Sequence, residues 1–98
     1  MKYKIQFSRR ADAELQFFAV FEQKIIVQGI ETHLAEQPLY ETRNRKPLRS
    51  NPVASWELRI QRYRVFYDVF ENEKLVKIAA IGYKEHNQLY FKGEEFDL

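Results

Sequence analysis

Three side chains near the middle of the chain are of the types that bind and transform a phosphate group: Glu57, Arg59 and Arg64. Guanidinium groups bind phosphate oxygens through paired hydrogen bonds, and a carboxylate can accept a proton. Arg59 and Arg64 lie in two alternating stretches separated by a short connection. If these stretches form an antiparallel hairpin, the arginines can face each other across it, and an anion between them would relieve their repulsion. The spacing therefore predicts a phosphate site.

Positive charge is concentrated around this pair of arginines. The 98-residue chain carries a formal net charge of only +2, yet Glu57 is the only acidic residue between positions 43 and 64. The basic residues of this segment are Arg43, Arg45, Lys46, Arg49, Arg59, Arg62 and Arg64. A field of this sign attracts phosphates and carboxylates, which predicts a polyanionic partner.

Other interpretations of these residues stay open at the level of sequence. Arginines on a solvated sheet face commonly serve solubility alone. Lys84 and Tyr90 could reach over the same face, or they could be a solvated lysine and a half-buried aromatic residue. His33 and His86 have no neighbouring His or Cys with which to hold a metal ion, so we expect no metal site. No glycine-rich phosphate loop is present, and no cofactor is indicated.

Composition indicates one globular domain over residues 1–98. Hydrophobic residues make up 45% of the chain, and there are only three glycines and three prolines. The absence of cysteine excludes disulfides and thiol catalysis. No segment is apolar enough for a secretory signal or a membrane span, so we expect no membrane association and a cytoplasmic protein.

The pattern of apolar residues predicts a strand and two helices in the first part of the chain. Residues 2–7 alternate as a strand does. Ser8 can cap a helix that continues to about residue 21, and a second helical pattern runs from residue 23 to residue 36, just before Pro38. A helical hairpin that turns near residues 21–24 is expected.

The second part of the chain predicts an antiparallel sheet. Residues 39–54 indicate a loop or a loosely paired edge strand, and strands are expected over residues 56–60, 63–70 and 75–81, joined by short connections as a meander. The fold class is α+β, with an N-terminal strand, a two-helix hairpin and a three-stranded meander in a curved sheet that carries the helices on one face. Residues 82–98 are too irregular to assign.

Alternation also predicts which face each side chain of the first meander strand occupies. Trp56, Leu58 and Ile60 should point toward the helices, whereas Glu57, Arg59 and Gln61 should lie on the opposite, solvated face.

The order of these elements, together with the segments Lys46-Pro47-Leu48, Trp56–Ile60 and Tyr63–Val69 (YRVFYDV), resembles the RelE/ParE family of toxins from bacterial and archaeal toxin–antitoxin modules. The resemblance covers nearly the whole chain and is most specific in the WELRI and YRVFYDV segments. It implies two helices packed on a curved antiparallel sheet. It also implies a cognate antitoxin protein that wraps around the toxin, with a toxin–antitoxin oligomer as the resting form.

The resemblance to RelE-like members implies a ribosome-dependent endoribonuclease that cleaves mRNA without a metal. The resemblance implies catalytic roles for Arg59, Arg64, Lys84 and Tyr90, and we add Glu57 as a candidate proton acceptor. From the local positive charge we expect Arg43, Arg45, Lys46, Arg49 and Arg62 to bind RNA. Glu57 stands where the ribonuclease pattern has a lysine, and Lys84 stands in place of an arginine. Two alternatives remain: a ParE-like, non-catalytic inhibitor of DNA gyrase, or an inactive domain that binds an antitoxin.

Overall fold

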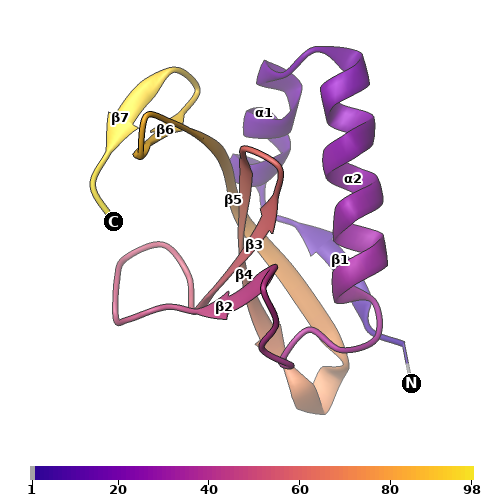
Figure 1. Ribbon diagram of the computed structural model, residues 1–98. Helices are drawn as coiled ribbons and strands as arrows, with labels where there is room; N and C mark the ends of the chain where they lie inside the picture. Colours follow the sequence, from indigo (N-terminus) through magenta and orange to yellow (C-terminus); the bar gives the residue numbers. More distant parts are fainter. Residues whose placement is uncertain (1) are drawn as a thin grey trace.

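Two helices lie against one face of a seven-stranded sheet in the computed structural model, which describes residues 2–98 (Figure 1). The elements are β1 (Lys4–Phe7), α1 (Arg9–Phe17), α2 (Val20–Leu34), β2 (Arg45–Pro47), β3 (Trp56–Ile60), β4 (Tyr63–Phe70), a 3-10 turn (Glu71–Glu73), β5 (Leu75–Glu85), β6 (Gln88–Phe91) and β7 (Glu94–Phe96). No helix within residues 2–98 has the length and apolar character needed to cross a membrane.

The sheet is built around β5. Strands β2 to β7 follow one another in space in the order β2-β3-β4-β5-β6-β7, and β1 pairs in parallel with the first half of β5. The pairs β3–β4 and β4–β5 are antiparallel. The predicted α+β class and the predicted meander are therefore confirmed.

The connection between the helices differs from the predicted one. The first helix ends at Phe17 instead of near residue 21, and Phe18 and Ala19 are extended before α2 begins at Val20. Two local contacts explain the early turn. Phe18 is buried with its ring edge-on to Tyr63, at 5.5 Å between centroids, and the Glu22 carboxylate accepts a hydrogen bond from the Ala19 amide at 3.1 Å. The predicted turn at residues 21–24 is wrong because these residues form the first turn of α2.

The last part of the chain, left unassigned by its sequence pattern, forms two hairpins. Strand β5 continues to Glu85 and turns at His86-Asn87 into β6, which turns at Lys92-Gly93 into β7. All four turn residues have positive φ, between 50° and 82°. Two-residue turns of this conformation match the twist of a β-hairpin and favour Asn and Gly. Asn87 and Gly93 were therefore the available sequence signals for these turns.

The helices cover the main apolar core. Side chains from α2, such as Ile26 and Ile30, pack against Leu58, Val65 and Tyr67 of the sheet, and all five are at most 1% exposed. The Tyr67 hydroxyl donates a hydrogen bond to the Pro38 carbonyl at 2.7 Å, which ties the segment after α2 to the sheet.

A smaller apolar cluster lies on the face of the sheet away from the helices. It contains Phe66, Ala80, Leu89 and Phe91, together with Ala54. The loop between β2 and β3 and the β6–β7 hairpin extend on this side of the sheet (Figure 1). The expectation that the face opposite the helices is uniformly solvated is therefore wrong, because these two segments cover part of it.

A bulge in β5 is held by the side chains of Ser8, which caps α1, and of Glu14 within α1. The β4–β5 register shifts between Phe66 and Tyr67, which leaves Ala79 unpaired with β4. The Ser8 hydroxyl donates to the Ala79 carbonyl at 3.0 Å, and the buried Glu14 carboxylate accepts from the Ile81 amide at 2.8 Å. Side chains of α1 thus replace the backbone partner that β5 loses where β1 ends.

We expect Glu14→Ala to destabilise the protein by about 2 kcal/mol, because it leaves the buried Ile81 amide without an acceptor. Glu14→Gln keeps a carbonyl oxygen at this place and should restore most of the stability. Urea unfolding followed by circular dichroism measures both. Equal losses in the two variants would show that the hydrogen bond to Ile81 is not the source of the effect.

Candidate anion-binding site on the open sheet face

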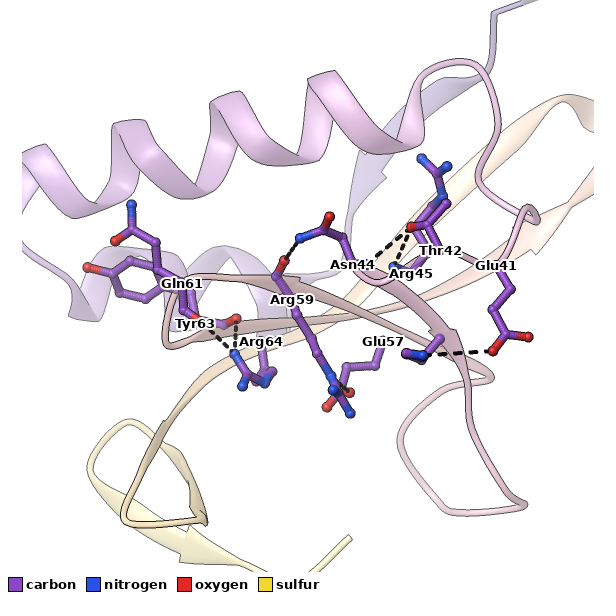
Figure 2. Close-up of polar contacts among 10 residues, drawn as sticks. Glu41, Thr42, Asn44, Arg45, Glu57, Arg59, Gln61, Tyr63 and Arg64 are labelled. Atoms are coloured by element: carbon purple, nitrogen blue, oxygen red, sulfur yellow. Dashed lines mark hydrogen bonds and ion pairs between the residues drawn. The ribbon is translucent and has the colours of Figure 1, made fainter.

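Arg59 and Arg64 form a cross-strand pair on the face of the sheet away from the helices. The register of β3 and β4 places the two residues directly opposite each other, as the sequence predicted. Figure 2 shows both side chains directed away from the helices. The Arg59 side chain is 46% exposed, and its terminal nitrogens make no hydrogen bond within residues 2–98. One guanidinium of the pair is therefore open to a ligand.

Glu57 does not lie in solvent as predicted. Its side chain is only 5% exposed, and its Oε1 accepts a hydrogen bond from Arg59 Nε at 2.9 Å (Figure 2). It lies on the predicted face, but neighbouring segments bury it there. Its Oε2 accepts no hydrogen bond in the part of the chain that the structure describes. This oxygen is therefore available to a ligand.

Arg64 is held by the hairpin turn rather than by an acid. Its NH1 donates to the carbonyls of Gln61 and Tyr63 at 2.8 and 2.9 Å, whereas its buried Nε has no partner. Burial lowers the pKa of this guanidinium; Glu57 opposes the shift and Arg59 adds to it. Arginine still stays charged at neutral pH. An anion here would supply the missing hydrogen bond and part of the missing solvation.

Two lysines complete the positive face. Lys46 pairs with Glu57 across β2–β3, and its Nζ lies 3.9 Å from Glu41. Lys84 lies two residues beyond Gly82, which is the β5 partner of Arg64, so alternation places Lys84 on the same face. Lys84 and Glu57 also line one cavity of about 290 Å³. The structure therefore brings together Arg59, Arg64, Lys84 and Glu57.

Tyr90 lies on the other face of the sheet. It pairs with Tyr83 across β5–β6, and the two rings stack at 5.3 Å between centroids. Tyr83 in turn contacts Phe17 and Phe18 at the end of α1 and just beyond it, on the helix side. The prediction that Tyr90 could reach over the arginines is therefore wrong, because its pairing with Tyr83 in the sheet places its side chain on the opposite face.

Two of the predicted RNA-binding residues are engaged in structural contacts. Arg45 is buried and donates to the carbonyls of Tyr40 and His33 at 2.7 and 2.6 Å, so it fixes the segment after α2. Arg62 lies 3.0 Å from the Glu22 carboxylate and over the Tyr83 ring, on the helix side. Neither guanidinium is available on the open face.

Arg43 and Arg49 are exposed, and Arg49 belongs to the loop between β2 and β3. They could therefore extend the positive surface. No group of three or more potential metal ligands is found within residues 2–98.

Sequence reasoning missed the side chains that the β6–β7 hairpin brings to this face. The cavity beside Glu57 and Lys84 is also lined by Asn87, Phe96 and Asp97. The sequence carried two signals for this placement, Asn87 and Gly93, which lie at the turns before β6 and β7. Both residue types favour two-residue β-hairpin turns, so they indicate that the last residues fold back onto the sheet.

The fold and this face define a small α+β protein. It carries helices on one side of its sheet and a surface with facing arginines, suited to anions, on the other. Residues 5–88 match the family model described as the ParE toxin of the type II toxin–antitoxin system parDE. The chain therefore belongs to this toxin family, within the RelE/ParE superfamily. A search of curated protein sequences finds no significant match.

Solved structures share the fold. A chain of the toxin–antitoxin complex RelBE2 from Mycobacterium tuberculosis superposes with a TM-score of 0.72 at 22% identity, covering 86% of this chain and 100% of that one. A chain of the archaeal RelE–RelB complex from Pyrococcus horikoshii gives a TM-score of 0.68 at 18% identity, covering 88% and 99%. These identities are low, so the similarity concerns the fold.

The pair formed by Glu22 and Tyr63 gives a pH-dependent prediction. The Tyr63 hydroxyl donates to Glu22 at 2.7 Å and is the main reason why the pKa of this carboxyl lies below its usual value; burial opposes the shift, and Ala19 and Arg62 support it. A lowered pKa in the folded state stabilises the protein above the pKa of the unfolded chain, and this stabilisation is lost as the pH falls through the folded value.

We expect Tyr63→Phe to raise the pKa of Glu22 and to cost about 1 kcal/mol of stability at neutral pH. Titration of the Glu22 carboxyl carbon by NMR, with urea unfolding at several pH values, measures both. Tyr83→Phe is the matched control, because no hydrogen bond joins its hydroxyl to Glu22 within residues 2–98. An unchanged Glu22 titration in Tyr63→Phe would contradict the assignment.

Proposed function

We propose that this protein is the toxin of a toxin–antitoxin module and acts as a ribosome-dependent, metal-free endoribonuclease that cleaves mRNA and inhibits translation. The observation that carries the proposal is the cross-strand pair of Arg59 and Arg64, with Lys84 and a carboxylate on the same face. This set supplies cations for a phosphate and a group that can accept a proton. The proposed site is cytoplasmic, where ribosomes and mRNA meet.

The chemistry fits cleavage by the neighbouring ribose hydroxyl. The 2′-oxygen attacks phosphorus, the bond from phosphorus to the 5′-oxygen breaks, and a 2′,3′-cyclic phosphate and a 5′-hydroxyl result. In our proposal Arg59 and Arg64 stabilise the charge that develops on the phosphoryl oxygens. Glu57 accepts the 2′-proton through its free Oε2, and Lys84 donates a proton to the 5′-oxygen or serves as a further cation.

The ribosome has a defined part in this mechanism. Glu57 is almost fully buried and already paired with Arg59, so a bound mRNA must be placed accurately to reach its free oxygen. Positioning of this kind contributes much of the rate enhancement in phosphoryl chemistry. We therefore expect the isolated protein to cleave free RNA slowly.

An antitoxin is the partner expected for the helix side. Phe17, Val20 and Phe21, around the α1–α2 turn, are 48%, 68% and 67% exposed. A groove of about 540 Å³ runs beside α2 from Val20 past Val27. Large apolar side chains that are exposed close together in this way favour a protein-binding site. The similar structures are toxin–antitoxin complexes, which supports an antitoxin as the occupant and an oligomer formed with it.

A non-catalytic inhibitor of DNA gyrase is the second candidate. The matched family model carries the ParE description, and Tyr90 lies away from the arginines. An assay of DNA supercoiling by purified gyrase separates the two candidates. Inhibition of supercoiling without RNA cleavage would favour the gyrase target.

We expect Arg64→Ala to lower the rate of mRNA cleavage on translating ribosomes by about 100-fold or more, because it removes a preorganised cation from the developing charge. Arg64→Lys should retain part of the rate, since it keeps the charge but loses the planar fork. Mapping of 5′ ends after incubation with ribosomes measures the cuts. Arg9→Ala, which removes an exposed charge at the start of α1, is the matched control and should cleave normally.

Expression of the protein should slow bacterial growth, and co-expression of a neighbouring antitoxin gene should restore it. Arg64→Ala should be much less toxic at equal protein level. Normal growth during expression of the unaltered chain would favour an inactive, antitoxin-binding domain. No cuts on ribosomes together with slowed growth would exclude the ribonuclease and leave another target.

A further inference from the structure

The turn between β3 and β4 contacts two basic residues of the candidate site through its backbone. The carbonyls of Gln61 and Tyr63 accept hydrogen bonds from Arg64 NH1 at 2.8 and 2.9 Å (Figure 2). The carbonyl of Arg62, which lies between them in the chain, accepts from the Lys84 amide at 2.9 Å. The place of this turn therefore sets the orientation of the Arg64 guanidinium.

The contacts of Arg64 leave one edge of its guanidinium for a ligand. Both carbonyls bind NH1, and neither Nε nor NH2 makes a hydrogen bond within residues 2–98. Nε and NH2 lie on the same edge of the group, so together they can donate to two oxygens of one phosphate. If NH1 lost its carbonyls, the guanidinium could rotate, and this edge would no longer be held in one direction.

The backbone of the turn depends on support from its surroundings. Gln61 has a φ of 53°. A residue other than glycine is crowded at such an angle, so the conformation persists only where neighbouring contacts favour it. The Lys84 amide supplies one contact, and a substitution of the Arg62 side chain leaves that backbone hydrogen bond in place. The remaining support comes from the Arg62 side chain.

The Arg62 side chain connects the turn to the first turn of α2. Its NH2 lies 3.0 Å from Glu22 Oε2, and its guanidinium lies over the rings of Tyr63 and Tyr83, at 5.2 and 4.9 Å from their centroids. The Tyr63 hydroxyl donates to the same Glu22 oxygen at 2.7 Å. The Arg62 side chain is 43% exposed, so its ion pair contributes little to global stability. Its effect should be local.

We propose that Arg62 is a positioning residue for the candidate site. Its contact with Glu22 holds the β3–β4 turn against α2, and the carbonyls of the turn then hold Arg64 with the Nε–NH2 edge available to a phosphate. Arg62 itself contacts no RNA in this proposal, because its guanidinium lies on the helix side. The inference rests on the proposed function, since it assigns a role within the same site.

The first test measures cleavage of mRNA on translating ribosomes by two variants of Arg62. Arg62→Met removes the charge but keeps a long side chain over the tyrosine rings. We expect it to lower the rate about tenfold, because the Arg64 cation loses its fixed orientation. Arg62→Lys keeps a cation for Glu22 and should recover most of the rate.

Arg10→Met is the matched control. Arg10 also combines an ion pair, at 2.9 Å from Glu14, with a place over an aromatic ring, at 4.6 Å from the centroid of Phe91, but it belongs to α1. This variant should cleave at the normal rate. Urea unfolding of both methionine variants shows whether lost stability alone slows cleavage.

A second test shows whether Arg62 acts through Arg64. Residues that act as a unit have non-additive effects, whereas independent contacts multiply their losses. We therefore expect Arg62→Met to cause less than a twofold further loss when it is added to Arg64→Ala. An independent contact of Arg62 with RNA would instead repeat the tenfold loss.

A third test examines the geometry without RNA. In the unaltered protein, hydrogen bonds to two carbonyls should slow the exchange of the Arg64 NH1 protons with water, which nitrogen-15 NMR of the guanidinium group measures. The Arg64 signal is identified by its absence in Arg64→Lys. Arg62→Met should lose this protection, and Arg10→Met should keep it.

Failure of the positioning role is distinct from failure of the proposed function. Normal cleavage by Arg62→Met, or protection of Arg64 that survives in this variant, would overturn the positioning role and leave the ribonuclease in place. A full tenfold loss in the Arg64→Ala background would overturn it as well. If the unaltered protein makes no cuts, the proposed function fails, and the NMR comparison by itself decides whether Arg62 positions Arg64.

Discussion

The register between β3 and β4 is the constraint on which the candidate site depends. It places Arg59 opposite Arg64 and Glu57 opposite Phe66. A shift of one residue would move every side chain of β3 to the other face, so Leu58 would leave the core and Arg59 would enter it. Burial of Leu58 and Val65, both fully inaccessible, holds this register. The energy that stabilises the apolar core thus also keeps two like charges side by side.

The two faces of the sheet carry different kinds of surface. The helix side carries the main core and, around the α1–α2 turn, exposed apolar side chains that suit a protein partner. The opposite side carries a small apolar cluster and the positive residues. Strand β5 connects these halves, because β1, β4 and β6 all pair with it and α1 holds its bulge through Ser8 and Glu14.

Glu57 gives the site a carboxylate acceptor, which a purely cationic surface would lack. Its carboxylate accepts a 2.9 Å hydrogen bond from Arg59, and the same residue lines a cavity together with Lys84 and residues of the β6–β7 hairpin. A nearly buried carboxylate next to two guanidinium groups places a group that can accept a proton beside cations on one face of the sheet.

The amino-acid sequence by itself determined the strands of the meander, the class of fold and the facing pair of arginines. It could do so because alternation and short connections are local properties, and they fix register once one face is apolar. It failed at the α1–α2 turn, where Phe18 leaves the helix to pack on Tyr63, a residue far along the chain.

Only the tertiary structure decided which charged residues are free. Arg45 and Arg62 look like Arg59 in the sequence, but backbone carbonyls hold the first and Glu22 holds the second. The hairpin of residues 88–96 lines a cavity together with Glu57, whose side chain is only 5% exposed, and its pairing with β5 places Tyr90 on the helix side. These outcomes depend on contacts between distant segments, and such contacts leave no periodic signal in the chain.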